Sequence, residues 1–351
     1  MERSFWLDLA ARGLRMPIGA DLILHERSDP KAVVYDGERL GEVIVEAARR
    51  FRTPLALALM DLTVEKASLL AALGLAAHDV DTWHFEQPPS DEQTARILEG
   101  LEGPLDSRAK AGVEAVAFAA RQSGLVAVGM CIGPFSLMTK LLADPITAVY
   151  LAGAGETAET ESEVAAVERC LELSLAAVLR SVRAQVNAGA KAIMLAEPAA
   201  STAYISPMQL EAGADLLERY VLGPCRRVRA LLNELGADLL FHCCGELTPD
   251  FVRGFASLDP AVLSLGSSRR LWEDASLVPR STVLFGNLPS KRFYSDELVS
   301  VADVEAMARD LIQRMREANH PFILGSECDV LSVAGSEQTI RRKVAAMLEC
   351  G

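Results

Sequence analysis

At 351 residues, the chain is long for one ordinary domain but of normal length for a barrel with insertions. Half of its residues are hydrophobic and only 5% are aromatic, which favours an aliphatic core of helices on a parallel sheet and argues against an all-β sandwich. The net charge of −13, without any basic stripe, argues against a nucleic-acid partner, which needs clustered Lys and Arg.

The acidic groups are expected on solvated helix surfaces; the alternative is docking with a partner protein that carries a basic patch. No segment approaches the ~18 uninterrupted apolar residues of a membrane span. Charges interrupt residues 1–20, so neither a membrane span nor a signal peptide is expected. Seven cysteines, two of them adjacent, are poor material for a disulfide framework and indicate a reducing cytoplasm.

Short apolar runs recur along the chain, and most are followed by a polar or glycine-bearing turn and a helical pattern. Their continuous apolar character is typical of strands buried on both faces, as in a parallel barrel, although some are rich in alanine. The sequence therefore predicts an α/β fold, a (β/α)8 TIM barrel. The expected strands are Leu55–Met60, Val80–Phe85, Leu125–Met130, Ala192–Leu195, Asp238–Phe241, Val262–Leu265, Val283–Phe285 and Phe322–Leu324.

Residues 1–50 precede the first expected strand and should form a helical or irregular N-terminal cap, with residues 51–351 forming the barrel. The long stretch 86–124 is expected to hold extra helices over the barrel mouth. No repeat or flexible linker interrupts the pattern, so we expect a single domain. Apolar residues at helical spacing predict three further helices, Glu161–Asn187, Asp303–Asn319 and Ser336–Glu349.

The residues that follow the expected strands matter most, because barrel active sites are built from these loops. Most of the eight positions carry a carboxylate, an imidazole or a thiol. This clustering is the first indication of an active site. In chain order the residues are Asp61, Glu86, Cys131, Glu197, His242, Gly266, Gly286–Asn287 and Gly325–Cys328.

The fifth expected strand ends in a pattern suited to binding a metal. Side chains alternate along a strand, so His242 and Cys244 share one face while Cys243 points the other way. Cys328 follows the eighth strand and can reach the same mouth. One imidazole and two thiolates are typical of a Zn²⁺ site with an open fourth position. The alternative is that the cysteines are simply buried and the histidine is only hydrogen-bonded.

Several motifs in this chain resemble the uroporphyrinogen decarboxylase superfamily, and more closely its zinc-dependent methylcobamide:thiol (coenzyme M type) methyltransferases. They occur in the family's order from about residue 55 to 345. The motifs are Met60-Asp61-Leu62-Thr63-Val64-Glu65, Ile132-Gly133-Pro134-Phe135-Ser136-Leu137, Ile205-Ser206-Pro207, His242-x-Cys244-Gly245, Leu284-Phe285-Gly286-Asn287-Leu288-Pro289 and Ile323-Leu324-Gly325-Ser326-Glu327-Cys328.

The resemblance implies zinc at His242, Cys244 and Cys328, a small thiol substrate, and a corrinoid cofactor carried by a partner protein. It implies transfer of a methyl group between that corrinoid protein and the zinc-activated thiol. Coenzyme M, another thiol and tetrahydrofolate all remain open as the methyl acceptor. The alternatives are a decarboxylase of this superfamily and a non-catalytic zinc-binding partner subunit of a corrinoid protein.

The decarboxylases hold substrate carboxylates with an arginine-rich N-terminal element and need no metal. Residues 1–30 offer Arg12, Arg15 and Arg27 in no such arrangement, which favours methyl transfer. The chain also departs from the methyltransferase pattern. Glu327 precedes the third ligand and is a candidate for the fourth zinc position, and Cys243 adds a thiol beside the site.

A zinc-bound histidine usually donates its other ring proton to a neighbouring acceptor. Glu197, Asp61 and Glu65 are candidates for this acceptor, and Glu197 is preferred because it ends the strand next to that of His242. A helix N-terminal acid is the alternative role for Glu197. Asn287 is expected either to hydrogen-bond within the mouth or to serve the geometry of its Gly-Asn turn.

Overall fold

The computed structural model describes residues 1–75 and 79–350 and contains an eight-stranded parallel sheet. The strands are hydrogen-bonded in the order β1-β8-β7-β6-β5-β4-β3-β2 and form a nearly closed barrel with β1 and β2 at the two ends of the order. The predicted α/β barrel class is confirmed. The strands are β1 Arg15–Ile18, β2 Leu55–Leu57, β3 Val126–Ile132, β4 Ala192–Ala196, β5 Asp238–Cys243, β6 Val262–Leu265, β7 Val283–Leu288 and β8 Phe322–Asp329.

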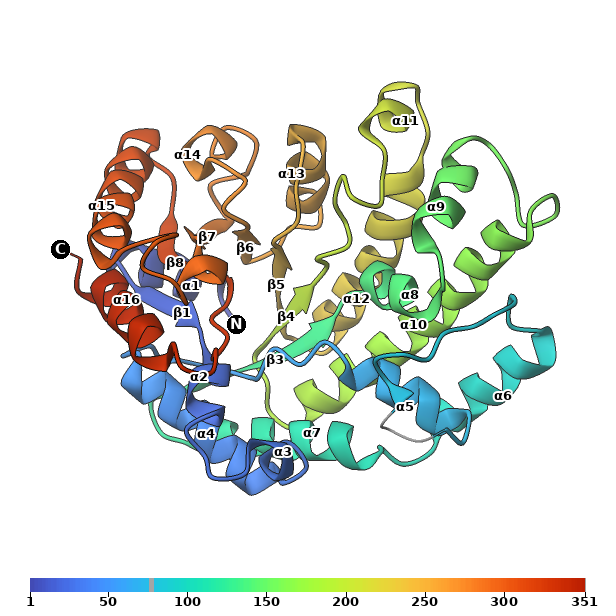
Figure 1. The fold of residues 1–351 in the computed structure, drawn as a ribbon, viewed down its shortest axis with the longest axis horizontal. Coiled ribbons are helices and arrows are strands. Elements are labelled where there is room, and N and C mark those ends of the chain that lie inside the picture. Colours follow the sequence, from blue (N-terminus) through green and yellow to red (C-terminus); the bar gives the residue numbers. More distant parts are fainter. Residues whose placement is uncertain (76–78, 351) are drawn as a thin grey trace.

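Helices surround the strands, and in Figure 1 the colours pass round this ring in chain order. The helices are α1 Arg3–Ala11, α2 Ala20–Leu24, α3 Pro30–Val33, α4 Gly37–Arg50, α5 Val64–Ala72, α6 Asp91–Glu102, α7 Ser107–Ala120, α8 Pro134–Leu141, α9 Pro145–Gly153, α10 Ser162–Asn187, α11 Pro207–Glu211, the π-helix η2 Leu217–Leu222, α12 Gly223–Glu234, α13 Pro249–Ala256, α14 Leu271–Asp274, the 3₁₀ helix η3 Ser290–Arg292, α15 Val301–Ala318 and α16 Glu337–Glu349.

Burial on both faces explains why the central strands are continuously apolar. Every residue of β4, β6 and β7 is buried, because one face lines the barrel interior and the other packs against the helices. Long amphipathic helices cover this outer face. The longest of them, α10, contacts β3, β4 and α8. The predicted helices at residues 161–187, 303–319 and 336–349 are confirmed as α10, α15 and α16, within two residues at each end.

Seven of the eight expected strands are confirmed, and the run Val80–Phe85 is wrong. Instead of extending, the chain turns here, because the backbone N–H groups of Thr82 and Trp83 both donate to the carbonyl of Asp79. Phe85 makes only an isolated bridge to Leu142. The strand that completes the set of eight is β1, which was not predicted and which pairs in parallel with β8.

The expected N-terminal cap is only partly what the structure contains. Strand β1 lies within residues 1–50, so the barrel begins inside the segment that was expected to precede it. Helix α1 does act as a cap, at the amino ends of the strands. Trp6 donates to the Asp238 carboxylate at 2.7 Å and Arg3 donates to the Pro260 carbonyl at 2.6 Å, which ties α1 to the starts of β5 and β6.

Two extra helices occupy the stretch 86–124, as expected, but α7 does not lie over the mouth. It packs against α4 and β3 in the outer layer of the barrel, and α6 packs against α5 and α10. Within the described part of the chain, no helix combines the length and apolar character needed to cross a membrane.

Candidate metal centre

Three side chains from β5, the residue after it, and β8 converge at the carboxyl end of the barrel. One ligand atom each from His242, Cys244 and Cys328 lies within 4.8 Å of the other two. His242 is 1% exposed and the two cysteines are partly exposed. The alternation of β5 explains the arrangement, because it turns His242 and Cys244 to one face. The structure thus brings together the three residues predicted as metal ligands.

The two ring nitrogens of His242 have different environments. Nδ1 lies 2.8 Å from the Ser264 hydroxyl on the neighbouring strand β6. Nε2 is buried and has no hydrogen-bond partner among the described residues. If Nδ1 carries the proton and donates it to Ser264, Nε2 presents a free lone pair. A buried nitrogen lone pair beside two thiols is a donor set that fits Zn²⁺.

The two thiols share one proton unequally. The Cys328 thiol donates to Cys244 and lowers the pKa of Cys244, and His242 and Lys291 add to this effect. The same hydrogen bond, together with burial, raises the pKa of Cys328. The Lys291 ammonium donates to the Cys244 carbonyl at 3.3 Å, which places a cation beside this residue. Binding of a divalent metal would displace the shared proton.

Cys243 and Glu327 both point away from this cluster. The Cys243 thiol lies 3.5 Å from the Ala200 carbonyl, and burial raises its pKa. One Glu327 oxygen accepts from the backbone N–H and hydroxyl of Ser267, and the other accepts from the Lys291 N–H. Glu327 therefore holds the loops after β6 and β7 together, and it is not among the clustered ligands of the described residues.

Glu197 does not accept the His242 ring proton, and that prediction is wrong. Its carboxylate is fully buried and accepts from the backbone N–H groups of Phe135 at 3.0 Å and Ser136 at 2.8 Å. These groups lie in the first turn of α8, where a carboxylate is stabilised by the helix dipole. Burial nevertheless raises the pKa of Glu197 to about 7. The alternative role predicted for Glu197, an acid at a helix N-terminus, fits this contact. The helix is α8, which precedes Glu197 in the chain.

Asp61 and Glu65 are also engaged elsewhere. The Asp61 carboxylate pairs with Arg108 at 2.5 Å and accepts from Thr63. Glu65 is 1% exposed and accepts from the Ser181 hydroxyl at 2.7 Å, while its second oxygen has no partner among the described residues. Burial raises the pKa of Glu65 to about 7. Neither carboxylate contacts His242, whose ring is oriented by Ser264.

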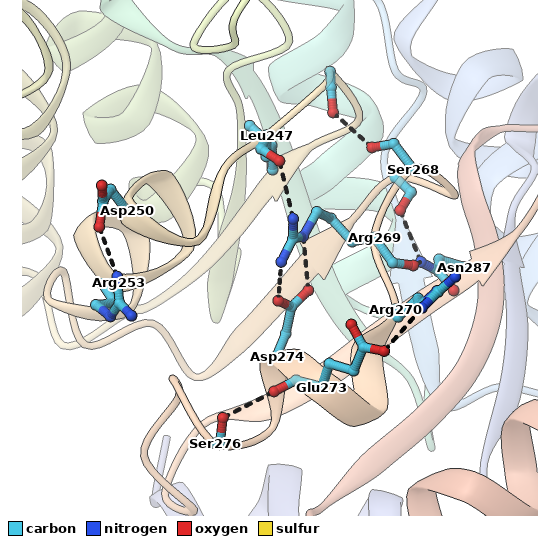
Figure 2. Close-up of polar contacts among 12 residues, drawn as sticks. Leu247, Asp250, Arg253, Ser268, Arg269, Arg270, Glu273, Asp274, Ser276 and Asn287 are labelled. Carbon is cyan, nitrogen blue, oxygen red and sulfur yellow. Dashed lines mark hydrogen bonds and ion pairs between the residues drawn. The ribbon is translucent and has the colours of Figure 1, made fainter. Parts of the chain in front are cut away.

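Asn287 hydrogen-bonds within the mouth, as one of its two expected roles required. Its amide donates to the carbonyls of Gly266 at 2.7 Å and Arg269 at 2.9 Å. Figure 2 shows a second set of contacts in the same loop, in which Arg269 donates to the Asp274 carboxylate and to the Leu247 carbonyl. At Gly266 a Cβ would come within 2.9 Å of the Cys244 backbone, so this loop packs directly against Cys244.

The family model for uroporphyrinogen decarboxylase (URO-D) matches residues 21–349. The chain belongs to this family. Among solved structures, a methyltransferase from Methanosarcina mazei superimposes with a TM-score of 0.69 at 16% identity, covering 95% of this chain and 93% of the other. The 3-keto-D-glucoside 4-epimerase YcjR from E. coli gives a TM-score of 0.40 at 14% identity, covering 69% and 86%. No curated protein matches the chain.

Two residues of this candidate site were missed from the sequence. Ser264 interrupts the apolar run of the sixth strand, and a lone polar residue at a fully buried strand position signals a hydrogen-bonding role. Lys291 gave no signal, because nothing in Ser290-Lys291-Arg292 distinguishes a cation at the site from an ordinary surface lysine. Its place depends on how the loop after β7 turns back over the mouth.

Proposed function

We propose that this URO-D family protein is a zinc-dependent methyltransferase that moves a methyl group between a corrinoid protein and a small thiol. The cluster of His242, Cys244 and Cys328 carries the proposal. Its three donors leave a fourth position for a ligand, as catalytic zinc sites do. The shared barrel fold of the M. mazei methyltransferase is consistent with it.

Zinc bound at this cluster would supply a thiolate at neutral pH, because coordination removes the proton of a substrate thiol. The chain's own residues prepare the site for that thiol. Ser264 fixes the His242 ring so that Nε2 faces the cysteines. The thiolates of Cys244 and Cys328 would offset the charge of the ion, which would leave the substrate sulfur nucleophilic. Lys291 in turn limits the excess negative charge beside Cys244.

The rim of the mouth supports docking of a protein that carries the corrinoid. Exposed apolar side chains stand on the segments that follow β7 and β8, and β8 is the strand that carries Cys328. Such side chains are typical of an interaction surface that also excludes water from the reacting atoms. They are Tyr294, Leu298, Leu331 and Val333.

The structure offers little to the decarboxylase alternative. A decarboxylase would need cations at the mouth to hold substrate carboxylates. Arg27 is paired with Glu46 at 2.6 Å, and Arg15 begins β1 at the amino end of the barrel, opposite the thiols. Neither arginine is available to a substrate at the carboxyl end.

The proposal is tested by metal analysis followed by spectroscopic assay of methylcobalamin demethylation with a panel of thiols. We expect about one equivalent of zinc per chain, because one cluster of three ligands holds one ion. We also expect demethylation that depends on the thiol. Cys328→Ala should lose both the metal and the activity. Cys243→Ala is the matched control, since this neighbouring thiol points away from the cluster and its removal should leave both intact.

Two results would contradict this function in different ways. Full methyl-transfer activity of the metal-free protein would remove zinc from the reaction, and with it the role proposed for the three ligands. Stoichiometric zinc without methyl transfer to any thiol, in the presence of methylated corrinoid protein, would indicate a non-catalytic zinc-binding subunit.

A further inference from the structure

A second concave site lies at the opposite end of the barrel from the thiols. This groove of about 540 Å³ is lined by residues from α1, from the segments before β1, β7 and β8, and from α15. Phe322 in the groove and Cys328 at the metal centre are six residues apart on β8, which corresponds to roughly 20 Å of extended chain. The groove is therefore distinct from the mouth.

The floor of the groove is apolar. It is formed by side chains that the core leaves partly uncovered, so a ligand's hydrocarbon or aromatic body would bury surface here. The volume falls within the ~300–1,000 Å³ of small-molecule sites. The floor residues are Leu7, Ala10, Leu14, Ile312 and Phe322.

The edge of the groove is cationic, on a chain whose net charge is −13. Arg15, Arg280 and Arg316 line it, and no Asp or Glu does. Among the described residues, Arg15 donates only to the Leu348 carbonyl at 3.3 Å. The guanidinium groups of Arg280 and Arg316 are exposed and have no carboxylate partner within residues 1–75 and 79–350.

These arginines contrast with others on the same surface. On α15 itself, Arg309 pairs with Glu305 and Arg314 pairs with Asp310. Two guanidinium groups without carboxylates, beside an uncovered apolar floor, are complementary to an anion with an apolar body.

We propose that this groove binds a small amphipathic organic anion. The apolar body lies on the floor formed by α1, α15 and Phe322, and the phosphate or carboxylate headgroup is held by Arg280 and Arg316. The site is independent of the metal centre and goes beyond the proposed methyl transfer.

The test uses 8-anilinonaphthalene-1-sulfonate, an aromatic anion whose fluorescence rises on apolar surfaces, with the full-length protein. We expect saturable binding with one dominant site. The double variant Arg280→Ala/Arg316→Ala should bind the probe at least 10-fold more weakly. Arg309→Ala/Arg314→Ala, which removes two charges from the same helix outside the groove, should bind like wild type.

Displacement of the probe identifies the chemistry of the headgroup. Octyl phosphate and octanoate should displace it, and their relative strength distinguishes a phosphate ligand from a carboxylate ligand. Octanol and inorganic phosphate, each with only half of the required chemistry, should compete poorly. Far-UV circular dichroism and zinc content of both double variants verify the fold.

Three outcomes would overturn the proposal. Non-saturable probe binding by wild type would mean that no site exists. Equal affinity of the two double variants would remove Arg280 and Arg316 from any site. Displacement by octanol as strong as by octyl phosphate would show a merely apolar surface. None of these results depends on methyltransferase activity, so they leave the proposed function untouched.

Discussion

At the scale of single residues, the pairing of His242 with Ser264 is the contact that would prepare His242 as a metal ligand. A serine hydroxyl 2.8 Å from Nδ1 fixes the ring and its tautomer, which leaves Nε2 free at the cysteines. Ser264→Ala should weaken zinc binding roughly 10- to 100-fold, the usual effect of losing such a partner. Competition with a chromogenic chelator measures this affinity.

Ser276→Ala is the control for that variant, because its hydroxyl is exposed and, in the part of the chain that the structure describes, donates only to the Glu273 carbonyl. It should leave zinc affinity unchanged. If Ser264→Ala also binds zinc like wild type, the ring is held by packing alone and the proposed orientation is incorrect.

A second residue-scale prediction concerns Glu65, whose pKa is raised to about 7 by burial. An unfolded glutamate titrates near ~4.3. The folded state thus holds the proton more tightly, so its contribution to stability is complete below pH ~4.3 and is lost as pH rises to about 7. Glu65→Gln removes this loss. Between pH 4.5 and 8, the free energy of unfolding of the variant relative to that of wild type should rise by on the order of 2–3 kcal/mol.

Urea unfolding at several pH values measures that gain. Glu273→Gln, an exposed glutamate, serves as the control and should show little pH-dependent difference from wild type. A Glu65→Gln effect that is the same at pH 4.5 and pH 8 would mean that Glu65 is already ionised in the folded protein at low pH.

The residues of the candidate site were predictable from sequence to different degrees. His242, Cys244 and Cys328 were found because strand alternation and strand ends constrain where side chains point. Glu197 was placed at the right strand end, but its partner depends on where α8 begins in space, which no sequence spacing gives. Ser264 could have been predicted, because it is a polar residue within the apolar run of the sixth strand, but it was overlooked.

At the scale of elements, the loop between β6 and α14 packs against Cys244 of the proposed metal centre. Asp274 is fully buried, and its only ion pair among the described residues is with Arg269. Arg269→Ala would leave that carboxylate buried without a cation, which typically costs about 3–5 kcal/mol. We expect this loss in the free energy of urea unfolding, together with weaker zinc binding, because the loop packs on Cys244.

Arg270→Ala tests the neighbouring position on the same loop. Its ion pair with Glu273 is exposed on both sides, so its loss should cost about 0–1 kcal/mol. Similar destabilisation by the two variants would show that Arg269 does not anchor the loop.

The elements also show where sequence patterns fail. Strand β1 was missed because Arg15-Met16-Pro17-Ile18 is four residues long and contains proline, and it is a strand only through its pairing with β8. Val80–Phe85 was wrongly predicted because aromatic and β-branched residues favour strands locally, whereas hydrogen bonds to Asp79 turn the chain there. Long helices such as α10 were predictable because their period is sustained.

At the scale of the whole molecule, the proposed metal ligands come from strands that are not neighbours in the sheet. In the barrel order, β5 and β8 are separated by β6 and β7. Cys244 and Cys328 therefore connect segments 84 positions apart through a contact that no ladder hydrogen bond provides. A metal held by both links the fifth and eighth βα units of one barrel.

Zinc should consequently stabilise the entire barrel and not only its mouth. A ligand that binds only the folded state adds about 2.7 kcal/mol to the free energy of unfolding when its concentration is 100 times its dissociation constant. We expect thermal unfolding of wild type to shift to higher temperature with zinc and to lower temperature with a chelator. Cys328→Ala should lose this response, and Cys243→Ala should keep it. A response that survives Cys328→Ala would place the stabilising ion elsewhere, because β8 would then contribute no ligand to it.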